Sequence, residues 1–422
     1  MSRNSWNRAA PPKNNGAVMA PNATAGQIAP ANNGVSDSNV APFVSKFNLI
    51  VPQSTPSGAC WNGQEVSVDF IIDPSMGKAL NMNLQFDVTC AATTGAGTFI
   101  ASSASFVRRI DYMFSGSVIE TVYAPSLLQE GLTFVTDQEL IQQAKLWGID
   151  ISAEYPAPYE VDTTGGEVKQ TFYLPLSGSV PGAQLFVAGL NGELRIRVYL
   201  APTVVCTKND YVSGAGAAVS LNALNLWVEE AGLSAGAYNA LLQQHDSGVN
   251  YRTVSRTVFQ RTQPTLTKDK PQADILNSFK NDSAALSVYL ASADTDPGFF
   301  MERYPLKALQ LLDSGGSTLT RILPAALVEN IITPSLTPIS SHFINSPDYT
   351  TYLFGHCSSL ARVLQGKVLG GLKYSGSEQI SITPAENSTN LVETVVSFDY
   401  LAMRVQQGDL RWAKTAGDVQ PW

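Results

Sequence analysis

Histidine is scarce in this sequence of 422 residues, and cysteine is not clustered. There are three histidines and four cysteines, and no two cysteines form a CxxC pair. A zinc site needs cysteine and histidine at short ligand spacings, which are absent here. A Ser-His-Asp hydrolase needs a histidine held by an acid beside a nucleophile. We therefore predict that the protein is not an enzyme, with no catalytic, cofactor-binding or metal-binding residues.

Charged residues are also few, at 15% of the chain against about 25% in an average domain. The formal net charge is -8 and the sequence pI is about 5.0. A chain that neutralises nucleic-acid phosphates is normally basic or carries a dense basic arm, so there is no strong nucleic-acid-binding signal. The 44% of hydrophobic residues excludes a disordered chain and favours an all-β protein with much buried or self-associating surface.

Long apolar runs are missing. No stretch of 18 apolar residues exists, and the N-terminus lacks the apolar segment of a secretory signal, so we expect neither a membrane span nor a leader peptide. Disulfide frameworks belong mainly to small secreted domains. We therefore expect free, mostly buried thiols at the four widely separated cysteines, which are Cys60, Cys90, Cys206 and Cys357.

Alternation of apolar and polar residues dominates from Phe43 onward. A period of two places one set of side chains on a core face and the other outward, as in a β-strand. The clearest cases are 66–70, 84–90 and 194–200. Short helices are predicted at 136–148, 234–244 and 324–331. Many strands with few helices indicate sandwiches or barrels rather than βαβ units.

An internal repeat joins residues 107–130 and 306–329, which align without a gap. Ser115-Gly116 falls opposite Ser314-Gly315, and Pro125 opposite Pro324. Each copy reads as a strand, a tight Ser-Gly turn, a second strand, a proline and a short helical run, and glycine adopts the positive φ of such a turn easily. The repeat predicts tandem copies of one domain.

Each copy is followed by a similar apolar strand, SLNALNLWV at 220–228 and SFDYLAMRV at 397–405. Residues 1–42 are rich in Asn, Ala, Pro and Gly without periodicity, which is typical of a flexible arm that orders on contact with a partner. We therefore expect an all-β fold of two tandem β-sandwiches, divided into an arm (1–42), a first sandwich (43–232), a linker (233–264) and a second sandwich (265–422).

This organisation resembles the double jelly-roll major capsid proteins of tailless icosahedral DNA viruses. The stretches 106–122 and 304–317 look like the corresponding hairpins of the two jelly rolls. The segment 172–176, followed by 194–200, is similar to the apolar strand with a proline that precedes a long alternating strand. The strand 221–230 resembles the one that closes the first jelly roll. The resemblance covers most of 43–422 as pattern and order rather than as a short motif.

The resemblance implies a structural protein of the virion, assembled inside the host cell. Two jelly rolls would stand side by side in each chain, and a homotrimer would form a pseudo-hexagonal capsomer that tiles an icosahedral shell. Its partners would be neighbouring capsomers, the vertex (penton) protein and minor capsid proteins. The arm would tie capsomers together or reach an internal membrane.

Isolated motifs have plainer interpretations. Residues 232–236 match GxSxG between a predicted strand and a predicted helix, but the nucleophile elbow belongs to parallel α/β sheets, so we interpret them as an inter-domain turn. Adjacent side chains on a strand point to opposite faces, so His356-Cys357 predicts half-buried packing rather than a shared site. We interpret His245-Asp246 as a solvated loop.

Two further groups of residues could bind a ligand. The loop residues Asn209, Asp210, Asp294, Asp296 and Asp313 offer calcium ligands, but polar turns account for them more simply. Arg252, Arg256 and Arg261 lie near Tyr251 and Phe259, which fits single-stranded nucleic acid. An inter-domain or inter-subunit contact fits better in an acidic protein.

Two other identities remain open. A single-shell-jelly-roll coat protein with a projecting β domain would carry a strongly basic arm, and Arg3, Arg8 and Lys13 fall short of one. A non-viral carbohydrate-binding cell-surface sandwich protein would carry a signal peptide. A glycosidase on such a scaffold would also need two carboxylates facing one cleft, which a sequence cannot locate.

Overall fold

The structure is a computed structural model of the full chain. It describes residues 45–54, 60–61, 63–90, 98–100, 103–124, 126–127, 147–150, 157–161, 166–202, 204–207, 210–212, 219–292, 304–337, 352–364 and 369–412. The predicted arm at 1–42 and all but the last two residues of the predicted helix at 136–148 lie outside this part of the chain.

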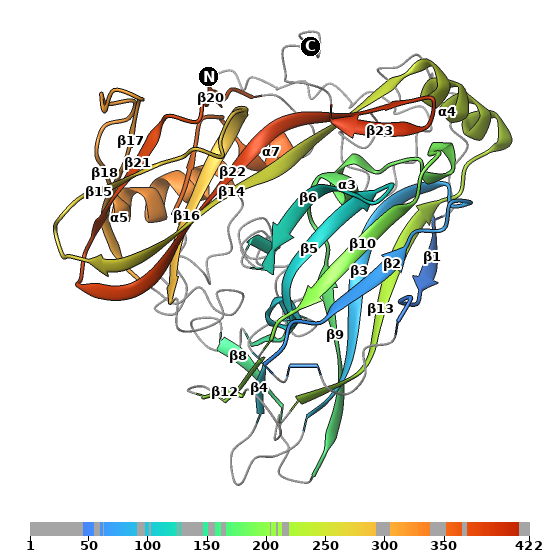
Figure 1. The fold of residues 1–422 in the computed structure, drawn as a ribbon, viewed down its shortest axis with the longest axis horizontal. Coiled ribbons are helices and arrows are strands. Elements are labelled where there is room, and N and C mark those ends of the chain that lie inside the picture. Colours follow the sequence, from blue (N-terminus) through green and yellow to red (C-terminus); the bar gives the residue numbers. More distant parts are fainter. Residues whose placement is uncertain are drawn as a thin grey trace, which may run out of the picture.

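The first half of the chain forms two antiparallel four-stranded sheets (Figure 1). One sheet has the order β1 (Ser45–Ile50), β13 (Val219–Ala231), β3 (Lys78–Cys90), β9 (Val168–Pro175). The other has the order β2 (Ser67–Ile71), β10 (Leu194–Leu200), β5 (Val107–Phe114), β6 (Ser117–Tyr123). Shorter elements complete this half: β4 (Thr98–Ile100), β7 (Ile149–Asp150), β8 (Ala157–Val161), β11 (Val204–Thr207), β12 (Asp210–Val212), η3 (Ser103–Phe106), α3 (Ser179–Ala183) and η4 (Val187–Gly189).

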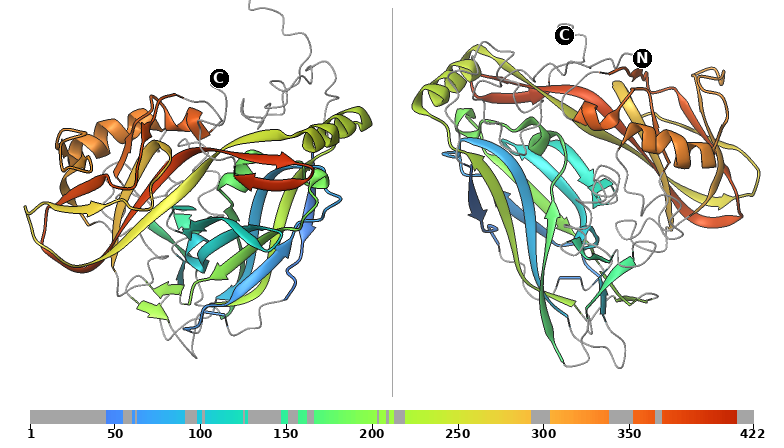
Figure 2. Two further views of the ribbon diagram at one scale, coloured as in Figure 1. Left: turned by 45° about the horizontal axis from the view of Figure 1, so that its top comes forward. Right: turned by 180° about the vertical axis from the view of Figure 1, so that it is seen from behind.

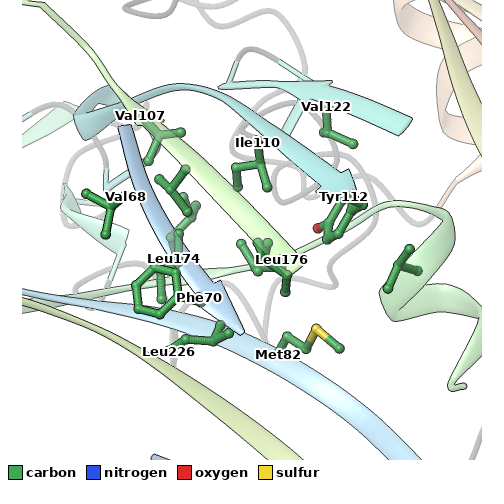
Figure 3. Packing of buried hydrophobic residues seen from close by; sticks show 14 of the residues in the cluster. Val68, Phe70, Met82, Val107, Ile110, Tyr112, Val122, Leu174, Leu176 and Leu226 are labelled. Atoms are coloured by element: carbon green, nitrogen blue, oxygen red, sulfur yellow. The ribbon is translucent and has the colours of Figure 1, made fainter. Parts of the chain in front are cut away.

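The core of this sandwich lies between its two sheets (Figure 3). Val68 and Phe70 on β2 face Leu174 on β9 and Leu226 on β13 across the interior. The predicted alternation is confirmed, because the apolar residues at 84–90 and 194–200 and both Val68 and Phe70 are buried, while the residues between them are half-buried or exposed. Val66, just before β2, is half-buried. Period-two patterning therefore predicted which face each strand buries.

The second half repeats this arrangement. One sheet has the order β14 (Val249–Leu266), β22 (Ser388–Gln406), β16 (Asp282–Ser292), β19 (Tyr352–Gly355). The facing sheet has the order β15 (Gln272–Ile275), β21 (Gln379–Pro384), β17 (Leu306–Leu312), β18 (Leu323–Pro324). The short strands β20 (Leu372–Lys373) and β23 (Asp409–Trp412) pair with β16 and β22.

Strand order confirms that the two halves are copies of one fold. In each half, the eight strands of the two facing sheets can be numbered in chain order, leaving out the short additional strands. One sheet then joins the first, eighth, third and sixth strands, and the other joins the second, seventh, fourth and fifth. This double-sheet arrangement of eight strands is a jelly roll. The apolar segments predicted as closing strands, 220–228 and 397–405, lie in β13 and β22, the eighth strand of each half.

The repeated hairpin is confirmed in the first half and altered in the second. Ser115 (φ 48°) and Gly116 (φ 82°) form a two-residue turn between β5 and β6, as a primed hairpin turn requires. In the second half the turn is longer, because the Asp313 carboxylate accepts the backbone N–H groups of Gly315 (2.8 Å) and Ser317 (2.7 Å). In this second turn the residue with positive φ is Gly316 and not Gly315, which aligns with Gly116. The gapless alignment therefore places the second turn one residue too early.

Two predicted helices are confirmed. Ser234 caps α4 (Ala235–Ser247), and its hydroxyl accepts the backbone N–H of Ala237 at 3.3 Å. The second begins after Pro324 and continues past its predicted end: α5 (Ala325–Leu327), the π-helical η5 (Val328–Ile332) and α6 (Thr333–Leu336). Together with α7 (Leu360–Leu364), α6 covers the outer face of the β14–β22–β16–β19 sheet over a separate apolar cluster.

The predicted linker at 233–264 requires correction, because it contains α4 and most of β14. Its polar composition resembles that of a linker. However, β14 pairs with β22 from Val249 opposite Val405 to Leu266 opposite Ser388, so its backbone groups are satisfied within a sheet. The part of this stretch from Val249 onward is therefore an integral strand of the second sandwich.

Candidate functional site at the seam between the sandwiches

A buried carboxylate joins the two sandwiches. Glu120 lies on β6, and its Oε2 accepts hydrogen bonds from the backbone N–H (2.5 Å) and the hydroxyl of Ser179 at the start of α3. Its Oε1 accepts the backbone N–H of Arg256 on β14, in the second sandwich, at 2.9 Å. Burial raises the pKa of Glu120, and the positive charge of Arg256 opposes that shift.

The local sequence explains how α3 reaches this carboxylate. Gly178 precedes α3 with φ 130°, and a Cβ there would lie 2.8 Å from the Tyr112 ring and 3.0 Å from Glu120 Oε2. Only glycine allows this approach. The Tyr112 hydroxyl donates to the Ser177 carbonyl oxygen at 2.7 Å, and the Thr253 hydroxyl of β14 donates to the Ser179 carbonyl oxygen at 3.0 Å. Both sandwiches therefore hold this turn.

The hairpin of β22 and β23 extends the contact between the two sandwiches across the first one (Figure 2). Met403, Val405 and Leu410 belong to the same buried cluster as the first core. The Trp412 indole N–H donates to the Ile119 carbonyl oxygen at 3.0 Å. Hydrophobic burial and hydrogen bonds thus join the sandwiches along a continuous contact, which we call the seam.

Helix α4 packs against the same sandwich through His245, whose side chain is 1% exposed. One ring nitrogen lies 3.0 Å from the Gly189 carbonyl oxygen and the other 2.6 Å from the Tyr251 hydroxyl. Burial lowers the pKa of His245. The prediction of a solvated loop at His245-Asp246 is therefore wrong for His245, because the second half folds back over the first and covers this side chain; Asp246 is exposed, but it lies in α4 and not in a loop.

The remaining histidine and serine candidates that the structure describes have structural roles. Ser234 lies between β13 and α4 and caps the helix, a role that agrees with a turn rather than with a nucleophile elbow. His356 and Cys357 are half-buried just after β19, as predicted, and the His356 Nε2 lies 3.0 Å from the Tyr374 hydroxyl. Burial lowers the pKa of His356 to about 4. His342 lies outside the described residues.

The basic and acidic candidates also have structural roles. Arg256 lies at the inter-domain contact, where its backbone N–H donates to Glu120 Oε1, and the exposed Arg261 forms an ion pair with the buried Asp274 of β15. Burial lowers the pKa of Arg252 to about 10. The Asp313 carboxylate closes a turn, as predicted, whereas the side chains of the other calcium candidates lie outside the described residues.

The cysteines that the structure describes are mostly buried, as the sequence predicts. Cys60 and Cys90 are buried, and Cys357 is half-buried. Within the described ranges, no group of three or more His, Cys, Asp or Glu side chains is placed to hold a metal ion. In the same part of the chain, no helix combines the length and apolarity needed to cross a membrane.

Several large apolar side chains are exposed, which the sequence does not indicate. Phe47, Leu49 and Val51 are 62%, 49% and 65% exposed on and just beyond the edge strand β1; we call them the β1 patch. Ile322 and Ile331 are 64% and 60% exposed around α5 and η5. All views place β1 and α5 at opposite ends of the molecule (Figures 1 and 2). The alternation of apolar and polar residues at 47–51 indicates a strand. It does not show whether another part of the protein covers the apolar face of that strand.

No known protein family and no curated protein matches this sequence. Solved structures match it. VP54 of PBCV-1, fitted into a reconstruction of the virophage Sputnik, has a TM-score of 0.66 and 14% identity over 89% of this chain and 98% of that chain. The major capsid protein of Faustovirus has a TM-score of 0.58 and 10% identity over 87% of this chain and 91% of that chain. A chain of Sulfolobus Turreted Icosahedral Virus has a TM-score of 0.52 and 11% identity over 84% of this chain and 90% of that chain.

The chain has the double jelly-roll fold. The match spans both sandwiches, so it agrees with the strand order, which repeats between the two halves. In this double jelly roll the seam joins the two rolls through Glu120 and the β22–β23 hairpin.

Proposed function

We propose that this protein is a major capsid protein that builds an icosahedral virion shell, assembled inside the host cell. The observation that carries the proposal is the double jelly roll, two eight-stranded sandwiches of identical strand order in one chain. The Faustovirus protein that shares this fold is a major capsid protein. A projecting domain of unrelated topology, as in the single-shell alternative, would not repeat the strand order. A structural role also fits the described residues, whose polar candidates act as caps, turns and seam contacts.

We propose further that three chains form a pseudo-hexagonal capsomer. Each chain supplies two similar sandwiches, so three chains around a threefold axis present six similar units. A head-to-tail contact closes into a ring when its rotation permits, and the opposite positions of the β1 patch and the α5 end suit such a contact. Depletion of charge favours burial of subunit surfaces.

The other proposed partners follow from the same role. They are neighbouring capsomers, a vertex (penton) protein and minor capsid proteins, with the arm at 1–42 contacting neighbours or an internal membrane. We retain 43–232 and 265–422 as the proposed extents of the two sandwiches, with β14 added to the second.

Light scattering on the purified full-length protein tests the trimer. We expect one species with three times the chain mass of 45.2 kDa. Electron microscopy of that species should show a pseudo-hexagonal outline. A stable monomer, or a closed assembly built on fivefold symmetry from single chains, would reject the capsomer.

A further inference from the structure

Two buried carboxylates face each other inside the second sandwich. Glu393 on β22 and Asp274 on β15 are 0% and 1% exposed and belong to opposite sheets. The side-chain amide of Gln263 on β14 lies between them: its Nε2 donates to Glu393 Oε2 at 2.8 Å and also to Asp274 Oδ2. A single amide therefore links the two sheets through two acidic groups.

The orientation of that amide is fixed by a further hydrogen bond. Gln272 Nε2, on β15, donates to Gln263 Oε1. The nitrogen of Gln263 must then face the carboxylates, so this side chain presents donors where a bound cation would require oxygen ligands. The arrangement suits protons better than metal ions.

The charges around Glu393 do not balance when both carboxylates are ionised. Arg261 on β14 pairs with Asp274 and lies opposite Glu393 in the β14–β22 register, while β16 places Leu290 opposite Glu393. One arginine thus faces two carboxylates. Glu393 Oε1 is buried with no hydrogen-bond partner among the described residues. An ionised carboxylate in that position is costly, and burial raises the pKa of Glu393 to about 7.

We propose that Asp274, Gln263 and Glu393 form a proton-dependent lock between the two sheets of the second sandwich. With a proton on Glu393 the cluster is charge-balanced and the sheets are held closed. Loss of that proton leaves an uncompensated charge between the sheets and loosens them. The lock does not depend on the capsid role, because it concerns the folding of one sandwich.

The direction of the pH dependence follows from linkage. A carboxyl that holds its proton more tightly in the folded state than in the unfolded chain stabilises the fold at low pH. That stability is lost as pH rises from about 4.3, the ordinary glutamate value, through about 7. Each unit of difference between the two pKa values changes the folding equilibrium tenfold, so the difference of about 2.7 units corresponds to roughly several hundredfold.

Thermal unfolding of the full-length protein tests the lock. Glu393→Gln mimics the protonated carboxyl, so its Tm should exceed that of the wild type by a margin that grows by several degrees between about pH 5 and about pH 8. Glu386→Gln, at an exposed glutamate in the β21–β22 turn, is the matched control and should follow the wild type. Parallel pH profiles for the wild type and Glu393→Gln would overturn the proposal.

Two further measurements separate the lock from a folding defect and from a cation site. If Glu393→Gln fails to fold, Asp274→Asn removes the competing charge and should flatten the wild-type pH profile; an unchanged slope would again overturn the lock. Hydrogen exchange, corrected for intrinsic rates, should show β15 and β22 losing protection at alkaline pH in the wild type alone. Calcium or magnesium that raises the Tm of the wild type but not of Glu393→Gln at alkaline pH would assign the cluster to a cation instead.

Discussion

Glu120 accepts hydrogen bonds from both sandwiches, so its replacement tests the seam directly. Glu120→Ala leaves the buried N–H groups of Ser179 and Arg256 without their acceptor, at about 1–3 kcal/mol for each unsatisfied group. We expect a loss of about 2–6 kcal/mol in the free energy of unfolding, measured in urea. The exposed Glu167→Ala is the control and should change stability by less than about 0.5 kcal/mol. Equal values for the two variants would remove Glu120 from the seam.

His356 gives a pH dependence opposite in sign to that of Glu393. Its pKa is lowered to about 4 by burial, below the ordinary value of about 6.5, so the folded state binds its proton less tightly than the unfolded chain. Stability is therefore lost as pH falls from about 6.5 to about 4. We expect His356→Gln to reduce this acid-side loss of Tm. An unchanged acid profile would contradict the buried, neutral histidine.

Residue patterns predict inward and outward faces well and burial by distant segments poorly. Alternation in β3 and β10 identifies their buried residues, because a sheet face is a local property of a strand. The polar residues next to His245 in the sequence predict a solvated position, whereas the structure buries this side chain. Its burial comes from Phe186 and Gly189, which are distant in the sequence, and no local pattern encodes that contact.

The two hairpins allow a matched test at the level of the element. Gly116 has φ 82° with open space around its Cβ position, so Gly116→Ala introduces backbone strain without a clash. A residue with a Cβ there should cost about 1–2 kcal/mol of unfolding free energy. Gly315→Ala, at the aligned position of the second hairpin, should be nearly neutral, because the positive φ there belongs to Gly316. Equal losses at both positions would mean that the two turns share one conformation.

Elements are predictable where turn and cap chemistry is explicit. The Ser-Gly turn, the cap of α4 and the proline before α5 all identify real boundaries. The strand β14 is not predictable in this way, because its polar residues resemble a linker and the partner that makes it a strand, β22, lies far along the chain. The repeat predicts two copies but not the longer second turn, which depends on the side chain of Asp313.

At the scale of the whole molecule, the proposed trimer should depend on the β1 patch. Phe47→Asp with Leu49→Asp places two charges on exposed positions, so the fold should be kept while a buried subunit contact is lost. We expect a shift from trimer to monomer in light scattering, with an unchanged circular dichroism spectrum. Val118→Asp, at a 52% exposed position on β6, is the control. A trimer that survives the double variant would place the contact elsewhere.

The pairing of β14 with β22 also sets how the protein would respond to force. The 18 residues of β14, about 60 Å of extended chain, run antiparallel to β22, and the ends of these strands also pack into the core of the first sandwich. A pull that separates the two rolls along these strands loads many inter-strand hydrogen bonds in shear at once, instead of opening them one after another. The two rolls would then resist being pulled apart as one mechanical unit rather than as two flexibly linked domains.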